Sequence, residues 1–328
     1  MIDFDSKIPF ENRENDILTV GELVIDMVYE EQVTLSQPCT YKQFFGGSAA
    51  NVAINSKQLG IRAMVAAAVG KDNLGDYLLN YLAKACLDTS FIQRVDESTS
   101  MVILNKSQGT PTPIFYRMAD YQLNYTQTLA QTVARSNVLH VSCWPISMEP
   151  ARNTVEKMIT LAKENHVLIS FDPNFHSLIW NPKESKAESL AYIKTMIQKV
   201  DIIKPSEDDA ERIFGKGKPE RQIEKFLQLG ARLVIMTLGK DGVIASNGSE
   251  LLRFPTLATE VVNTTGAGDA FWSGFYAGII KGYTIQDSIT FGGMASAYKL
   301  KSISTVADLP KLERLMELYH IKHGEVIA

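Results

Sequence analysis

The sequence contains little cysteine and no excess of positive charge. Its 328 residues include three cysteines and no C-x-x-C pair, so neither a disulfide framework nor a structural zinc site is expected. Lys and Arg number 33 against 37 Asp and Glu. A chain without a basic excess lacks the charge that holds a nucleic-acid backbone, which argues against nucleic acid as a partner.

Long hydrophobic runs are also missing. The apolar run that includes Met64 to Val69 is far too short to cross a bilayer. The opening MIDFDSKIPFENREND is acidic where a secretory signal would be basic and then apolar. The five histidines include no H-x-x-x-H pair, which argues against a transition metal held by the protein. These features predict a soluble cytoplasmic protein with no membrane partner.

What the chain does contain is a regular alternation of β-type and helical runs. The β-type runs are strongly apolar and the helical patterns lie between them, with strands expected at 63–69, 137–142, 167–174 and 232–239 and helices at 74–86, 150–164 and 187–199. Apolar strands separated by helices are typical of a parallel sheet covered on both faces. With no internal repeat or low-complexity linker in view, we expect one α/β domain over 1–328.

Two segments interrupt this alternation. Residues 27–45 and 99–125 alternate polar with β-branched or aromatic residues, and SQGTP at 107–111 predicts a hairpin turn. We expect these segments to form a small β-layer that stands off the main sheet.

The stretch NTTGAGDAFWSGF at 263–275 places three small residues directly before Asp269. The preceding LATEVV at 257–262 predicts a strand, and apolar residues at helical spacing follow it, so we expect a strand-to-helix turn. The free N–H groups at a helix N-terminus favour an anion, and small side chains let the anion approach. Asp269 would then stand beside a phosphate site as a proton acceptor.

Three interpretations compete for this stretch. A dinucleotide-binding fingerprint would need a third glycine where Phe271 stands. A purely structural turn would use Asp269 as an N-cap residue. In the third interpretation, phosphoryl transfer, backbone amides hold the charge and the carboxylate acts as base. The usual Walker A loop is missing, because no Gly-Lys pair is followed by Ser or Thr.

A second pair of glycines occurs in FFGGSAANVAINSKQLG at 44–60. Gly46 and Gly47 predict the end of a strand, and a helix is expected from about Ser48 to Gly60. Taken alone, such a pair is ordinarily just a turn. Together the two stretches resemble the two signatures of the ribokinase-like (PfkB) carbohydrate kinases, and the resemblance runs from TVGELVID at 19–26 to the C-terminal helices.

The resemblance implies a three-layer α/β/α fold with a mostly parallel central sheet and a small β-sheet lid made from 27–45 and 99–125. It also implies transfer of a phosphoryl group from ATP, with Mg²⁺, to a primary hydroxyl of a small sugar. The carboxylate of G-A-G-D takes the proton from the acceptor hydroxyl in such kinases, and here this residue is Asp269. The backbone amides of Gly266, Ala267 and Gly268 would hold the charge on the transferred group.

The resemblance also implies a sugar pocket. Such kinases hold the sugar hydroxyls with a carboxylate at the end of the first strand, the backbone of a Gly-Gly pair and a helix Asn, which match Asp26, Gly46, Gly47 and Asn51 here. The segments at 114–126 and 171–180 resemble fructokinase, 2-keto-3-deoxygluconate kinase and 5-dehydro-2-deoxygluconokinase relatives, and they add Tyr116, Arg117 and His176. Because His176 replaces an Arg and cannot clamp a carboxylate with two parallel bonds, we expect a neutral ketohexose ahead of a keto-deoxy sugar acid.

On the nucleotide side, the resemblance implies Thr237, Gly239 and Gly242 from VIMTLGKDGVIA at 234–245. Ser206 and Asp209 replace an Asn and a Glu that organise Mg²⁺ and the phosphates through water in such kinases. Both replacements are shorter or have fewer polar atoms. The organisation of the metal is therefore left open by the sequence.

Asn263 is a third departure, since many members have an Asp there at a monovalent-cation site, and we expect weaker activation by potassium. The resemblance further implies a homodimer through the lid. Three rivals stay open: a catalytically weak sugar-sensing protein of the same fold, which the departures at Ser206, Asp209 and Asn263 favour; a nicotinamide oxidoreductase; and a nucleoside kinase.

Overall fold

The central feature of the fold is a nine-stranded sheet in the order β13-β12-β11-β10-β9-β8-β1-β4-β5. The structure, a computed structural model, describes residues 2–29, 40–105, 113–322 and 325–326. The strands of this sheet are β1 (Asn15–Val20), β4 (Ala63–Gly70), β5 (Ile92–Val95), β8 (Ser136–Ser142), β9 (Leu168–Asp172), β10 (Ile202–Ile203), β11 (Leu233–Thr237), β12 (Val243–Ser246) and β13 (Leu251–Phe254).

Most neighbouring strands of this sheet are parallel, and only β12 and β13 run antiparallel to their neighbours. The central strand β1 pairs with β8 and β4 at once, so that Val20 lies between Val141 and Ala66. Strands buried on both faces need apolar side chains at every position, which is why the predicted runs were apolar throughout. The expected mostly parallel α/β sheet is confirmed.

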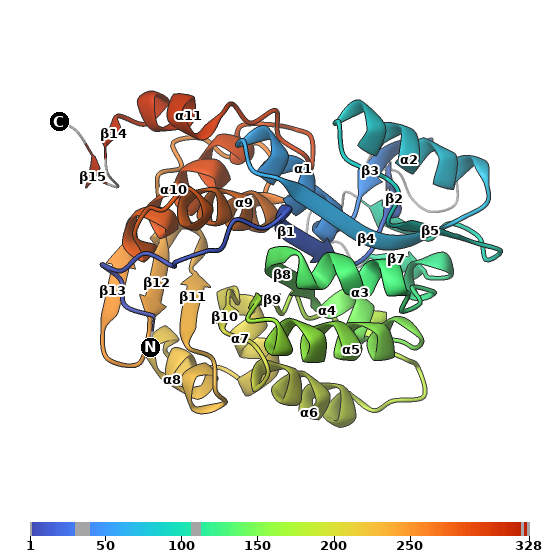
Figure 1. Ribbon diagram of the computed structural model, residues 1–328, viewed down its shortest axis with the longest axis horizontal. Coiled ribbons are helices and arrows are strands. Elements are labelled where there is room, and N and C mark those ends of the chain that lie inside the picture. Colours follow the sequence, from blue (N-terminus) through green and yellow to red (C-terminus); the bar gives the residue numbers. More distant parts are fainter. Residues whose placement is uncertain (1, 30–39, 106–112, 323–324, 327–328) are drawn as a thin grey trace.

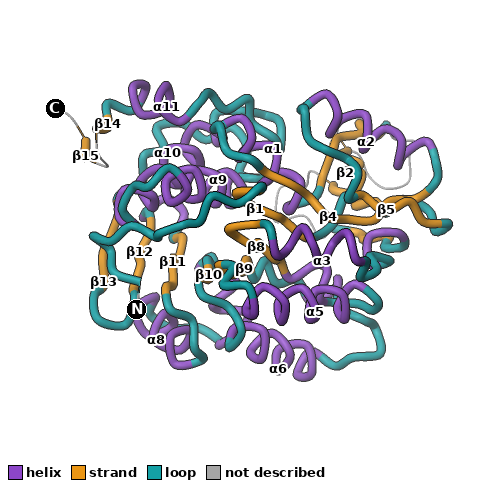
Figure 2. The backbone as a smooth tube through the Cα atoms, viewed as in Figure 1, coloured by secondary structure: helices purple, strands orange, loops and turns teal. Residues whose placement is uncertain are grey.

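Helices cover both faces of this sheet, which gives the expected three layers (Figures 1 and 2). One face packs against α1 (Ser48–Gln58), α2 (Asn73–Lys84), α9 (Ala267–Ile280), α10 (Ile285–Leu300) and α11 (Leu312–Leu318). The other packs against α3 (Gln127–Ala134), α5 (Ala151–Glu164), α6 (Lys186–Ile197), α7 (Glu207–Phe214) and α8 (Pro219–Gln228). In the described part of the chain, no helix has the length and apolar character needed to span a membrane.

Shorter elements complete the chain. They are the helix α4 (Cys143–Ile146), the 3-10 turns η1 (Ala119–Tyr121), η2 (Ser177–Ile179) and η3 (Gly239–Asp241), and the terminal strands β14 (Ile321–Lys322) and β15 (Glu325–Val326).

A second sheet lies toward the right of Figure 1 and has the order β3-β2-β6-β7. Its strands come from the two interrupting segments: β2 (Val24–Tyr29), β3 (Tyr41–Gly46), β6 (Met101–Asn105) and β7 (Ile114–Tyr116). It is antiparallel except for the β2 and β6 pair. The expected small β-layer is therefore present. The hairpin turn expected at 107–111 lies outside the described residues.

The segment around residues 16–30 contains two strands that belong to different sheets. β1 ends at Val20 in the main sheet, and β2 begins at Val24 in the small sheet. The chain turns at Gly21, where an added Cβ would lie 2.7 Å from the Cβ of Ala49. As a result, Asp26 is not at the end of the first strand, as its match implied, but inside β2.

The strand expected at 257–262 does not form. The chain leaves β13 at Phe254 and runs without regular structure to α9. The N–H groups of Val262 and Asn263 donate to the carbonyl oxygen of Leu300, at 2.8 and 3.3 Å. The end of α10 thus satisfies this backbone in place of a neighbouring strand, and α9 follows a loop.

Candidate active site

A cleft of about 500 Å³ opens where the parallel strands end and the small sheet begins. Several segments distant in sequence line it. Residues from the first glycine stretch, the second glycine stretch and the strand ends contribute, among them Glu22, Asp26, Gly47, Ser48, Asn51, Asp172, His176, Lys204, Ser206, Asp209, Gly266, Gly268 and Asp269. Carboxyl ends of parallel strands are the usual place for a ligand in such sheets.

Helix α9 begins directly at this cleft. Gly266 caps it in the left-handed conformation at φ 81°, and an added Cβ would lie 2.3 Å from the carbonyl oxygen of Thr305. The Ala267 N–H donates to the Thr264 carbonyl at 3.2 Å. The N–H groups of Gly266 and Gly268 donate to no described residue. These two amides lie at the positive end of the helix dipole and can therefore donate hydrogen bonds to a bound anion.

Asp269 lines the cleft and is held by two residues of helix α1. The Ser48 hydroxyl donates to Oδ1 at 2.6 Å, and the Asn51 amide donates to Oδ2 at 2.8 Å. Burial raises the pKa of the Asp269 carboxyl, and these two hydrogen bonds oppose the rise. A carboxylate with a raised pKa in a cleft is suited to accept a proton.

The predicted sugar residues Asp26, Gly46, Gly47 and Asn51 are brought together near Asp269. An added Cβ on Gly46 would lie 2.6 Å from the Asp26 carboxylate, and one on Gly47 would lie 2.3 Å from the Glu22 carbonyl. Glycine is therefore required at 47, where the close contact is with backbone, whereas at 46 it leaves space for the Asp26 side chain. Burial, with the Asp269 charge as a smaller cause, raises the pKa of Asp26 to about 7.

Glu22 is a cleft residue that the sequence analysis missed. It is buried and accepts the Ser48 N–H at 2.6 Å, while its second carboxyl oxygen has no partner among the described residues. Burial raises the pKa of Glu22 to about 8, with a smaller contribution from the charge of Asp269. A carboxylate inside the apolar run VGELVI was the signal that could have found it.

Lys204 was also missed. Its ammonium lies 3.2 Å from Asp172 and over the ring of Trp272, whose Nε1 donates to Asp172 at 2.7 Å. The Lys204 Nζ would lie 3.4 Å from a Cβ on Gly268, so a positive charge flanks the free amides. A lysine directly after the apolar pair Ile202 and Ile203 was its signal.

Ser206 and Asp209 form a capping box at the start of α7. The Ser206 hydroxyl and N–H both reach Asp209 Oδ2, at 2.6 and 3.0 Å, and Oδ1 accepts the Phe175 N–H at 2.9 Å. Burial raises the pKa of Asp209. Both residues line the cleft, yet their polar atoms are largely used in holding the helix.

The three residues nominated from the other segments have different positions. His176 lines the cleft beside Phe115, with ring centroids 5.3 Å apart. Tyr116 is 53% exposed on β7. Arg117 is buried in an ion pair with Asp120, hydrogen-bonds to Ser147 and lies outside the cleft. The structure therefore does not bring Arg117 or Tyr116 to Asp269.

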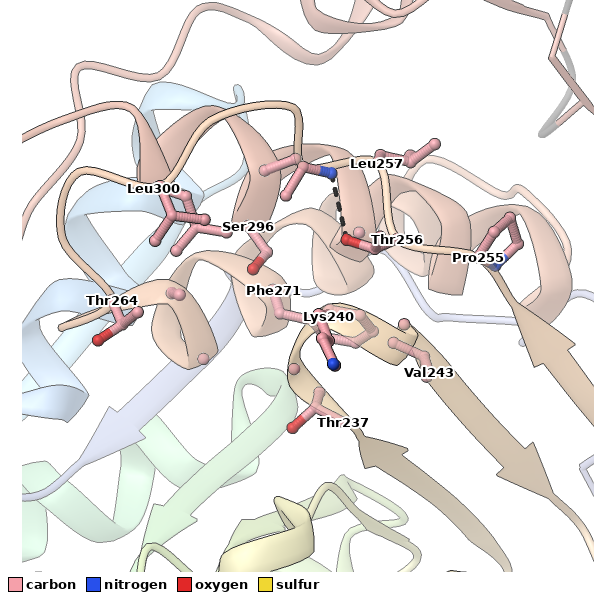
Figure 3. Close-up of a pocket in the computed structure, with 18 residues that line it drawn as sticks. Thr237, Lys240, Val243, Pro255, Thr256, Leu257, Thr264, Phe271, Ser296 and Leu300 are labelled. Carbon is pink, nitrogen blue, oxygen red and sulfur yellow. Dashed lines mark hydrogen bonds between the residues drawn. The ribbon is translucent and has the colours of Figure 1, made fainter.

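A second, more apolar cleft of about 340 Å³ adjoins the first (Figure 3). Thr237, Gly239 and Gly242 line it, as predicted for the nucleotide side, and Phe271, Ser296 and Leu300 form the opposite wall. Thr237 and Gly268 line both clefts. A ligand extending from one cleft to the other therefore passes the start of α9.

Asn263 lies in the loop before α9 and lines neither cleft. Its side chain donates to the Ile303 carbonyl at 2.7 Å and accepts the Thr265 N–H at 3.0 Å. The main-chain carbonyl of Asn263 accepts a hydrogen bond from the Lys299 ammonium at 2.8 Å. In the described residues no group of three or more His, Cys, Asp or Glu side chains could hold a metal ion.

Comparison with known proteins identifies the family. Residues 14–312 match the pfkB family carbohydrate kinases. The chain is 52% identical over 322 residues to an ATP-dependent 6-phosphofructokinase of Thermoanaerobacterium thermosaccharolyticum, covering 98% of this chain and 99% of that protein. It is 27% identical to a 5-dehydro-2-deoxygluconokinase of Clostridium perfringens, with 100% of this chain and 98% of that protein covered.

Among solved structures, the fructokinase of Halothermothrix orenii is 36% identical and has a TM-score of 0.75, over 84% of this chain and 96% of that one. The fold and family expected from the two glycine stretches are therefore confirmed, and the oxidoreductase interpretation is wrong. The chain belongs to the pfkB family of carbohydrate kinases.

Proposed function

We propose that this kinase transfers the terminal phosphoryl group of ATP to a primary hydroxyl of a ketohexose, with Asp269 as general base. The observation that carries the proposal is the place of Asp269 and Gly268. The carboxylate lines the larger cleft, and the preceding glycine lines both clefts. A sugar hydroxyl in the larger cleft and a nucleotide in the apolar cleft would meet there.

In this mechanism, Asp269 takes the proton of the sugar hydroxyl as its oxygen attacks phosphorus. Ser48 and Asn51 fix both carboxylate oxygens, which keeps the base in one orientation. The free amides of Gly266 and Gly268 and the nearby Lys204 ammonium would stabilise the charge on the transferred group.

Magnesium would neutralise charge on the ATP phosphates. The described residues offer it no cluster of three ligands, so most of its ligands would come from the nucleotide and water. Asp209 and Ser206 would act on it only through water, because they also cap α7. The adenine and ribose would lie in the apolar cleft beside Thr237, Gly239 and Gly242.

The charge of the larger cleft supports a neutral sugar. Lys204 is the one lysine or arginine among the described residues that line it, and it stands at the phosphoryl end. No lysine or arginine among the described residues stands at the sugar end beside Glu22 and Asp26, so a carboxylate or phosphate on the substrate would find no cation there. Fructose is thus the first candidate, ahead of a keto-deoxy sugar acid.

The small sheet borders the sugar end and would act as a lid, which excludes water during transfer. Ile114 and Tyr116 on β7 are 48% and 53% exposed, and a homodimer through this sheet stays a prediction. Cys86 and Cys143 are free thiols among the described residues, which supports a cytoplasmic location for such a kinase.

The proposal is tested by measuring ADP release with ATP, Mg²⁺ and each of several acceptors: fructose, fructose 6-phosphate, 2-keto-3-deoxygluconate, 5-dehydro-2-deoxygluconate, ribose and a nucleoside. We expect the highest kcat/KM with fructose. Preference for fructose 6-phosphate, the substrate type that the name of the 52% identical relative suggests, would show that the described cleft residues do not set the charge preference. Binding of sugar without ADP release would favour the sugar-sensing alternative.

A further inference from the structure

Lys299 is a buried lysine without a carboxylate partner. It is the second-last residue of α10, its exposed fraction is 0%, and it forms no ion pair with a described residue. Its ammonium donates to the main-chain carbonyl of Asn263 at 2.8 Å. A buried charge without an opposite charge costs free energy unless polar groups compensate it, so this position calls for an explanation.

The ammonium lies under the loop that leads into α9. Its Cε would lie 3.6 Å from a Cβ on Gly266, the residue that caps that helix. The same end of α10 accepts the N–H groups of Val262 and Asn263 through the Leu300 carbonyl. The loop is therefore tied to the end of α10 both by its backbone and by the lysine.

The surroundings compensate the charge in part. A cation near the C-terminus of a helix is stabilised by the helix dipole, and Lys299 lies in the last turn of α10. Burial lowers the pKa of Lys299 to about 8, while the Asp269 charge raises it. The ammonium thus keeps most of its charge at neutral pH.

We propose that Lys299 is a positioning residue that acts as the protein's own fixed cation beneath residues 263–266, so that the Gly266 and Gly268 amides face the phosphoryl group without help from an added potassium ion. This inference rests on the proposed function. The neutral Asn at 263 agrees with it, because a bound alkali ion would gain from a carboxylate there, whereas a buried ammonium already supplies the positive charge.

A purely structural role would also bury Lys299, so the experiment must distinguish a structural role from a positioning role of the charge. Lys299→Met keeps the length of the side chain and removes the charge, Lys299→Arg keeps the charge, and Lys299→Ala leaves space. The matched control is Lys301→Met, since Lys301 is exposed two residues later on the same helix end. Sugar-dependent ADP release is measured in potassium-free buffer and after addition of potassium or ammonium chloride.

We expect the wild-type rate to change less than about twofold on adding potassium. Loss of a charged hydrogen bond corresponds to about 10- to 100-fold, so kcat of Lys299→Met should fall by that factor with little change in the sugar KM. Ammonium should restore part of the rate of Lys299→Ala, which a structural role alone would not allow. Lys301→Met should behave as wild type.

Two further measurements keep the test decisive. If Lys299→Met does not fold, two measurements still test the inference. They are the response of the wild-type rate to potassium and the rate of Lys299→Arg, which keeps the charge. If the wild type phosphorylates no sugar in the panel, the proposed function fails. Calorimetric binding of Mg-ADP and of adenosine then tests Lys299 separately. Lys299→Met should bind Mg-ADP more weakly than the wild type and adenosine equally well. More than tenfold potassium activation of the wild type, or an unchanged rate and ADP affinity in Lys299→Met, overturns the inference.

Discussion

The hydroxyl of Ser48 lies 2.6 Å from Oδ1 of Asp269, although 221 residues separate them in the chain. Ser48 opens α1 and Asp269 lies in the first turn of α9. The contact joins the N-termini of these two helices, and each follows a glycine whose side chain would collide with the backbone. Both glycine stretches therefore serve one site.

The first prediction concerns the base. Asp269→Asn removes the proton acceptor and keeps the shape of the side chain, so sugar-dependent ADP release should fall about 10²- to 10⁴-fold. Thermal unfolding should show a folded protein. The control is Asp308→Asn, which changes an exposed carboxylate and should leave the rate unchanged. Unchanged turnover in Asp269→Asn would falsify the mechanism.

The second prediction concerns pH. The Ser48 hydrogen bond lowers the pKa of Asp269, so Ser48→Ala should raise that pKa further. The base is active only when ionised, and activity is lost as the pH falls through its pKa. The acidic limb of the kcat/KM profile should therefore move to higher pH in Ser48→Ala, whereas exposed Ser90→Ala should not move it. A shift to lower pH would contradict the assignment.

The third prediction concerns stability and Glu22. Its pKa is about 8 in the folded protein against an ordinary value of 4.5. Between these values the folded state holds a proton that the unfolded state has lost. The contribution of Glu22 to the free energy of unfolding is therefore fully present below pH 4.5 and is lost as the pH rises toward 8. The loss follows a slope of up to about 1.4 kcal/mol per pH unit.

Glu22→Gln cannot lose this proton, because the neutral amide resembles the protonated acid. Its free energy of unfolding, measured by urea titration, should therefore fall less than that of the wild type between mildly acidic and alkaline pH. Glu164→Gln, at an exposed position, is the control and should follow the wild type. Parallel curves for Glu22→Gln and wild type would show that Glu22 is ionised in the fold.

The fourth prediction separates packing from substrate binding at Arg117. The side chains of Arg117 and Asp120 are 7% and 0% exposed. Arg117→Met would leave the Asp120 carboxylate buried without its charge partner, which typically costs about 3–5 kcal/mol. Arg314→Met breaks an exposed pair with Glu317 and should cost less than about 1 kcal/mol. If Arg117→Met instead raises the sugar KM at unchanged stability, the predicted contact of Arg117 with substrate would be supported.

The fifth prediction tests the apolar cleft. Ser296 lines it (Figure 3), and Ser296→Trp would fill part of the space proposed for the nucleotide. The KM for ATP should rise at least about tenfold, which corresponds to about 1.4 kcal/mol of lost binding. The KM for sugar should change little. Gln286→Trp, exposed at the other end of α10, is the control, and equal effects of both variants would remove the nucleotide assignment.

The amino-acid sequence by itself predicted the layers of the fold. Apolar strand runs separated by helical patterns allow little besides a parallel sheet between helices, and this sheet was found. The turns at Gly47 and Gly266 were also predictable, because only glycine tolerates a φ of 121° or 81° next to a backbone carbonyl. Asp269 followed from its place at such a turn.

Only the tertiary structure decided which polar side chains face the cleft. Glu22 and Lys204, which line the cleft, lie in apolar runs where the local pattern gives no direction to their charges. Lys299 is buried away from both clefts, and its partner Asn263 is likewise distant in sequence. Arg117 was expected in the sugar pocket, yet Asp120 and Ser147 hold it in the interior. The strand expected at 257–262 was lost because the end of α10 satisfied its backbone. Local sequence sets backbone conformation, whereas contacts between distant segments set burial and the charge of the site.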